Sequence, residues 1–147
     1  MLQADLKECA SLRVQVGVLG QKDTRMAAHG EPAGNAEIGA IHEFGRIYDN
    51  IPRRSFLFDP LTYELGKEVA AQGATAWRLH FLQKGFKSVL GNLGILATKV
   101  VDQAFASAGY GRWPANSPMT IAFKGSSSPL IDTAQLRQSI SFRLKKA

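Results

Sequence analysis

Cysteine is almost missing from this sequence of 147 residues, in which Cys9 is the only one. A single cysteine excludes an intramolecular disulfide framework and a cysteine-rich zinc site. No apolar run approaches the roughly 18 residues that cross a membrane, and the first residues show no signal-peptide pattern. The composition, 45% hydrophobic and 20% charged, excludes collagen, a coiled coil and wholesale disorder. We therefore expect one globular domain over residues 1–147 and no membrane partner.

The usual signs of catalysis are missing as well. The sequence contains no G-x-S-x-G elbow, no P-loop and no phosphate-binding G-x-G-x-x-G. The three histidines, His29, His42 and His80, do not have the spacing of metal ligands. Asp102 and Asp132 are the only acidic residues of the second half, which makes a catalytic carboxylate pair improbable. We expect no enzyme, no catalytic residue, no metal and no cofactor.

Charge is unevenly distributed along the chain. Residues 1–69 hold 8 basic and 10 acidic side chains, whereas residues 70–147 hold 10 basic and 2 acidic ones, so the net charges are −2 and +8. A basic half can indicate a polyanionic or acidic partner, or simply a solvated surface. The charge alone leaves these alternatives open.

Two stretches alternate between apolar and polar residues, at residues 12–19 and 139–145. This period of two predicts half-buried strands, and we expect the two strands to pair because few other strands are available. Residues 35–45 predict a short helix, with Asn35 as its N-cap and Gly45 as its end.

A longer helical pattern follows. Asp59 and Pro60 form a typical helix start, with Asp59 as N-cap, and the apolar stripe continues to about Lys84. After Gly85 a second helix is expected over about residues 88–107. The sequence therefore predicts an α+β fold, in which a long antiparallel helical hairpin packs on a small, mainly antiparallel sheet that contains the N- and C-terminal strands.

Two segments lack periodicity. Residues 20–34 predict a mobile loop, or an extended hairpin, and long loops of this kind are often functional. Residues 110–129 predict an irregular loop that contains Trp113. After it, Asp132 and Gln135 have the spacing of a capping box and predict about one turn of helix.

Three stretches carry a resemblance: Ala36-Glu-Ile-Gly-Ala-Ile-His-Glu-Phe-Gly45, Ile51-Pro-Arg-Arg-Ser-Phe-Leu57 and Leu130-Ile-Asp-Thr-Ala-Gln-Leu-Arg-Gln-Ser-Ile140. In this order they resemble the virion-morphogenesis and tail-completion proteins of long-tailed bacteriophages, over about residues 36–147. The residues that match the structural motifs of that family are Glu43, Phe44, Gly45, Pro52, Phe56, Asp132, Thr133, Leu136 and Ser139.

These motif residues have structural roles on physical grounds also. Glu43 and Phe44 end a helix, Pro52 fixes an extended entry and Phe56 can anchor in the core. Arg53 is placed for a carboxylate or carbonyl partner. The sequence departs from the family twice, since Ser55 replaces a proline and Ala134 replaces a glycine. We expect Ser55 to loosen the extended segment, and Ala134 to fit a helical first turn after Asp132.

The resemblance implies a structural protein of the virion, assembled in the host cytoplasm, that forms a ring, commonly of six subunits. Its partners would be further copies of itself, the tail tube and the head connector, with non-specific contact to DNA in the channel as a further option. Candidate interface residues are Arg25, His29, Arg46, Arg53, Arg54, Tyr110, Arg112 and Trp113. A half-buried core position is an alternative for Trp113. The rival function is a basic nucleic-acid-binding accessory protein.

Overall fold

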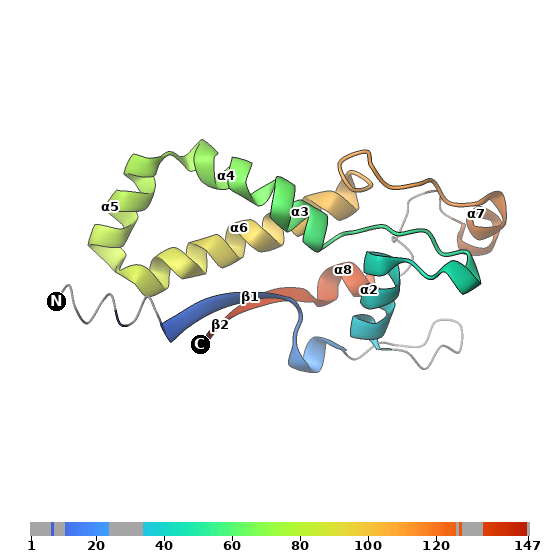
Figure 1. Ribbon diagram of the computed structural model, residues 1–147, viewed down its shortest axis with the longest axis horizontal. Coiled ribbons are helices and arrows are strands. Elements are labelled where there is room, and N and C mark those ends of the chain that lie inside the picture. The colour runs from blue at the N-terminus through green and yellow to red at the C-terminus, as the bar shows by residue number, and fades with distance from the viewer. Residues whose placement is uncertain (1–6, 8–10, 24–33, 126, 128–133, 147) are drawn as a thin grey trace.

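The computed structural model describes residues 7, 11–23, 34–125, 127 and 134–146 (Figure 1). The chain has an α+β fold in which helices pack on a two-stranded sheet. The elements, in chain order, are β1 (Leu12–Val18), η1 (Gly20–Asp23), α2 (Asn35–Phe44), η2 (Ile47–Asp49), α3 (Phe58–Tyr63), α4 (Leu65–Gln72), α5 (Ala74–Lys84), α6 (Phe86–Ala106), α7 (Pro118–Lys124), α8 (Gln135–Ser139) and β2 (Ile140–Lys146).

The sheet confirms the predicted pairing of the two alternating stretches. β1 and β2 are antiparallel, with Val16 opposite Phe142 and Val18 opposite Ile140. Helix α6 lies along this sheet (Figure 1). A Cβ atom on Gly94 of α6 would overlap the ring of Phe142, so the missing side chain lets the helix backbone approach the strand closely.

The helical hairpin is present, but its first arm is not the single helix that was predicted from Asp59 to about Lys84. The arm is divided into α3, α4 and α5, which arch over α6 in Figure 1. Gly73 separates α4 from α5 with a φ of 80°, a conformation that ends a helix and that glycine adopts without strain. The second arm, α6, is a continuous helix of 21 residues, as expected.

The predicted N-cap residues of two helices, Asn35 and Asp59, were wrong. Helix α3 begins at Phe58, so Asp59 lies inside its first turn, and the Asp59 amide donates instead to Ser55 Oγ at 2.9 Å. Helix α2 begins at Asn35, whose side chain donates to the Lys22 carbonyl. The acceptor for the second amide of α2 is Asp23 Oδ1, 2.6 Å from the Ala36 nitrogen. Because this cap comes from a residue that is distant in the sequence, the local spacing of residues around the start of α2 could not predict it.

The buried core joins the hairpin to the elements around it. Phe56, Val101, Phe105 and Leu136 form one cluster, each at most 4% exposed. The Phe56 and Phe105 rings have centroids 5.1 Å apart. Trp113 packs edge-on against Phe105 at 5.8 Å, which gives this indole the core position that was the alternative in the sequence.

The segment predicted as an irregular loop contains a helix, α7. Ser117 caps it, because Ser117 Oγ accepts a hydrogen bond from the Thr120 amide at 3.1 Å and Pro118 occupies the first turn. The expected mobile loop at 20–34 begins with η1, and its residues 24–33 lie outside the described part of the chain. None of the described helices is long and apolar enough to cross a membrane.

Candidate functional site

Glu43, at the end of α2, holds the turn that leads into α3. Its carboxylate is buried and accepts four hydrogen bonds. Oε2 accepts from the backbone amides of Phe56 and Leu57, both at 3.0 Å, while Oε1 accepts from the Phe58 amide at 3.0 Å and from Ser55 Oγ at 2.5 Å. These donors include amides at the start of α3 that have no partner within the helix. The negative charge also lies at the positive end of that helix.

Ser55 tightens this segment, contrary to the loosening that we expected from the sequence. Its side chain is buried, donates to Glu43 and accepts from the Asp59 amide. The hydroxyl thus links two elements, which a proline at this position could not do. Gly45, two residues after Glu43, has a φ of 76°, and a Cβ atom there would lie 2.9 Å from the Arg53 nitrogen.

Arg54 is buried and serves the interior, although it was expected at an interface. Its Nε donates to the Pro114 carbonyl and its second terminal nitrogen to the Ala115 carbonyl, both at 3.0 Å. Trp113 Nε1 donates to the Ser55 carbonyl at 3.0 Å. Burial lowers the pKa of the Arg54 guanidinium. These bonds fasten the loop after α6 to the segment before α3.

Four of the predicted interface residues meet at one small pocket of about 70 Å³, namely Arg53, Tyr110, Arg112 and Trp113. Arg53 makes a bidentate ion pair with Asp59, at 2.8 and 3.1 Å, so that of the two expected kinds of partner, carboxylate or carbonyl, it has a carboxylate. The Tyr110 hydroxyl donates to the Val100 carbonyl at 3.0 Å. Burial raises the pKa of this phenol.

Arg112 links this pocket to the first arm of the hairpin. One of its terminal nitrogens lies 2.5 Å from Glu64 Oε1, and its guanidinium lies over the rings of Tyr63 and Tyr110. Hydrogen bonds from Lys67 and Arg112 lower the pKa of Glu64. Arg53, Tyr110 and Arg112, which line the pocket, therefore already have partners within the chain. The pocket is a structural contact between the first arm of the hairpin and the loop after α6.

The third motif contributes Leu136 to the core. Ser139 Oγ donates to the Leu136 carbonyl at 2.6 Å and is buried. Ala134 has a φ of 58° and therefore does not sit in a helical first turn, as we had expected. A left-handed conformation favours glycine over alanine. Asp132 and Thr133 lie outside the described residues.

The end of α2 and the compact turn after it present three of the four most exposed large apolar side chains among the described residues. Ile47 is 91% exposed, Tyr48 99% and Phe44 76%. We call these three residues the apolar corner. No sequence pattern singled out Ile47 or Tyr48, although an Ile–Tyr pair between Gly45 and Asn50 is unusual for a solvated turn. Arg46, an expected interface residue, lies beside them and pairs with Asp49 at 2.9 Å.

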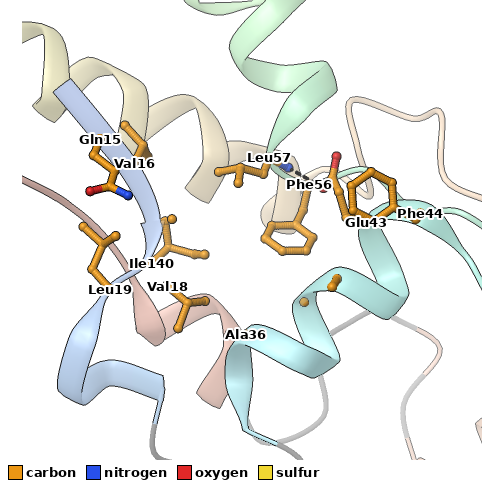
Figure 2. Close-up of a pocket in the computed structure, with 13 residues that line it drawn as sticks. Gln15, Val16, Val18, Leu19, Ala36, Glu43, Phe44, Phe56, Leu57 and Ile140 are labelled. Atoms are coloured by element: carbon orange, nitrogen blue, oxygen red, sulfur yellow. Dashed lines mark hydrogen bonds between the residues drawn. The ribbon is translucent and has the colours of Figure 1, made fainter. Parts of the chain in front are cut away.

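A groove of about 320 Å³ lies between β1 and α2 (Figure 2). Its lining is mostly apolar, with residues such as Val18, Leu57 and Ile140, while α2 contributes Ala36, Gly39 and Ala40. Among the described residues that line it, Glu43 is the only acidic one, and both of its oxygens accept hydrogen bonds from the chain. The carboxylate of Glu43 is therefore occupied by structural hydrogen bonds.

The described residues hold no group of three or more His, Cys, Asp or Glu side chains that could bind a metal ion. Of the predicted interface residues, Arg25 and His29 lie outside the described part of the chain. Comparison with family models, with curated proteins and with solved structures finds no match to this chain.

Proposed function

We propose that this protein is a structural assembly protein of the head–tail junction of long-tailed bacteriophages, acting in tail completion or in the neck. It forms a ring, of six subunits in the simplest form, that joins the tail tube to the head connector. The protein then resides in the virion, performs no catalysis and carries no cofactor.

The observation that carries the proposal is the convergence of the three motifs behind the resemblance. Glu43 of the first motif binds the backbone of Phe56 in the second motif. Phe56 then packs in one buried cluster with Leu136 of the third motif. Gly39, also in the first motif, leaves room for both, because a Cβ atom there would lie 3.2 Å from the Phe56 ring and 3.3 Å from Leu136. Residues far apart in the sequence thus form one scaffold.

The character of the surface supports the same proposal. Among the described residues, large apolar side chains are exposed on α2, η2, α3, α5, α6 and α7. Such side chains are typical of protein–protein contacts, and scattered single ones are normal on any protein. Three such side chains within five residues, at the apolar corner, go beyond that.

Electron microscopy of particles made without the protein tests the proposal. We expect separate heads and tails, or tails of abnormal length, and restoration of normal particles when the protein is supplied in trans. Normal infectious particles in its absence would overturn the proposal.

A nucleic-acid-binding accessory protein is the second candidate, and the charge of residues 69–101 favours it. Residues 69–101 contain Arg78, Lys84, Lys87 and Lys99 and no acidic residue. Phosphate contacts would make binding to short DNA duplexes fall steeply with salt. Salt-dependent binding by a protein whose loss leaves virions intact would favour this candidate over the first.

A further inference from the structure

The sheet has one apolar face and one basic face. Helix α6 packs on the apolar face, where Gly94 lies against the ring of Phe142. Side chains alternate between the two faces of a strand, so the residues between the apolar ones lie on the opposite side, which we call the outer sheet face. Its residues are Arg13, Gln15, Gly17, Ser141, Arg143 and Lys145. This face therefore combines three basic residues with no acidic and no large apolar one.

The three basic side chains of the outer sheet face are exposed, and α6 runs along the other side of the two strands (Figure 1). Among the described residues, Arg13, Arg143 and Lys145 form no ion pair. Four other arginines do pair with carboxylates. They are Arg46, Arg53, Arg112 and Arg137. The outer sheet face thus carries three positive charges that no described side chain neutralises.

The register of the strands brings these like charges together. Arg13 lies directly opposite Lys145. Arg143 is two residues from Lys145 along β2 and lies on the same face, roughly 7 Å away. Like charges at directly opposite positions destabilise a sheet. Because the face has no acidic residue of its own, a bound polyanion would relieve this repulsion.

The guanidinium of Arg143 is oriented by Gln15 from the neighbouring strand. Arg143 Nε donates to Gln15 Oε1 at 2.9 Å. The two terminal nitrogens of Arg143 have no hydrogen-bond partner among the described residues. A guanidinium held in this way can donate two parallel hydrogen bonds to the oxygens of a phosphate group. The pair is therefore suited to a phosphate contact.

The composition of the outer sheet face indicates which polyanion it fits. Binding to another protein relies mainly on aromatic or other large anchors, and single-stranded nucleic acid relies on aromatic side chains on which its bases stack. The outer sheet face has no such side chains. A two-stranded ribbon is narrow enough for the major groove of B-form DNA, whereas the major groove of an RNA duplex is too deep and narrow for protein side chains to read. These features favour double-stranded DNA.

We propose that the outer sheet face binds the phosphate backbone of double-stranded DNA through Arg13, Arg143 and Lys145. Phosphate contacts carry no sequence information directly, so the binding is independent of sequence. The proposal goes beyond the proposed function, since a structural role in the virion does not require this surface. It also places the DNA contact away from residues 69–101, whose charge favours the second candidate function.

Two triple variants test the proposal. The sheet variant replaces the basic residues of the outer sheet face, by Arg13→Gln, Arg143→Gln and Lys145→Gln. The hairpin variant is the matched control and replaces three residues that are also exposed and form no ion pair within the described part of the chain, by Arg78→Gln, Lys84→Gln and Lys87→Gln. Fluorescence anisotropy with a labelled short DNA duplex of mixed sequence measures the association constant over a range of salt concentrations.

For the wild-type protein, we expect the association constant to fall steeply as salt rises. Each phosphate contact contributes about 0.9 to the slope of log K against log salt concentration, so the slope of the sheet variant should be smaller by about 2.7. The hairpin variant should keep the wild-type slope. The sheet variant should also unfold at a urea concentration no lower than the wild type, because the contact between like charges is removed.

A wild-type protein that does not bind the duplex, a sheet variant with the wild-type slope, or a loss confined to the hairpin variant would overturn the assignment of this surface. Binding that is as tight to poly-glutamate, to single-stranded DNA or to an RNA duplex of the same length would overturn the choice of double-stranded DNA. All of these measurements use the purified protein. Particles made without the protein therefore test its role in the virion separately.

Discussion

Ser55 Oγ donates a hydrogen bond to Glu43 Oε1 across 2.5 Å, and both side chains are buried. This pair ties the end of α2 to the segment that enters α3. The same serine hydroxyl accepts from the Asp59 amide, and the same carboxylate accepts from three backbone amides. The link between the first two sequence motifs is therefore a small polar network within the fold.

Glu43→Gln should destabilise the protein by about 3 kcal/mol. The glutamine amide group can accept hydrogen bonds on one side only, so two of the four donors lose their acceptor. The negative charge at the start of α3 is also lost. Urea unfolding, followed by circular dichroism, measures the change. Glu37→Gln, on the exposed side of α2, should cost at most about 1 kcal/mol. Equal losses in the two variants would refute the role assigned to Glu43.

Arg54→Ala and Arg53→Ala should differ sharply although the residues are neighbours. Arg54 is buried and donates to two carbonyls, so its loss should cost about 3 kcal/mol. Arg53 forms an exposed ion pair with Asp59, which is worth less than about 1 kcal/mol. Thermal and urea unfolding of both variants provide the comparison. An Arg53 variant that is the less stable of the two would contradict this ordering.

Ala134→Gly should stabilise the protein by about 0.5–1 kcal/mol, against the usual effect of glycine. The φ of 58° at Ala134 is strained for alanine and free for glycine. Ala76→Gly, in the first turn of α5, is the control, since glycine should cost up to about 1 kcal/mol in a regular helix. The measurement is the shift in the unfolding midpoint, and a loss of stability in both variants would show that Ala134 is not strained.

Stability should fall in acid through Glu64. Hydrogen bonds from Lys67 and Arg112 hold its pKa below the ordinary value of 4.5. A lowered pKa in the folded state stabilises the protein above the unfolded pKa, and this stabilisation is lost as the pH falls from about 4.5 through the folded pKa. Asp102, whose pKa Arg137 lowers, acts in the same direction below 3.8.

Arg112→Gln removes one of the two donors and should flatten the acid side of the stability profile. Arg78→Gln, which removes an exposed positive charge from α5, should leave that slope unchanged. Free energies of unfolding from neutral pH down to below the ordinary pKa of Glu64 test both variants. Parallel profiles for the wild-type protein and Arg112→Gln would exclude the assigned cause.

Much of the fold could be predicted because the relevant signals are local. The alternation at residues 12–19 and 139–145 marks both strands, and Gly45 and Gly85 mark helix ends. The predicted single first arm failed because Gly73 is tolerated inside many helices, and only its φ of 80° shows that it ends one here. Glycine costs a helix only about 1 kcal/mol relative to alanine, and this difference is too small to predict from the sequence whether a helix ends at Gly73.

The candidate site was harder to predict, since its roles depend on partners distant in sequence. Arg54 binds carbonyls about sixty residues away, so its charge suggested a surface position that it does not have. Glu43 was recognised as part of a motif, but its four donors lie on another segment. Ile47 and Tyr48 were missed because exposure of an apolar residue in a turn has no periodic signature.

The pairing of β1 with β2 has a consequence for synthesis. Leu12 pairs with Lys146 and Val18 with Ile140, so the two paired strands are separated by nearly the whole length of the sequence. As the ribosome makes the protein, β1 emerges long before β2, the strand with which it pairs in the described part of the chain. Such long-range closure is slow, and unpaired strands tend to aggregate meanwhile. The yield of folded protein should therefore depend on how the nascent chain is protected during this interval.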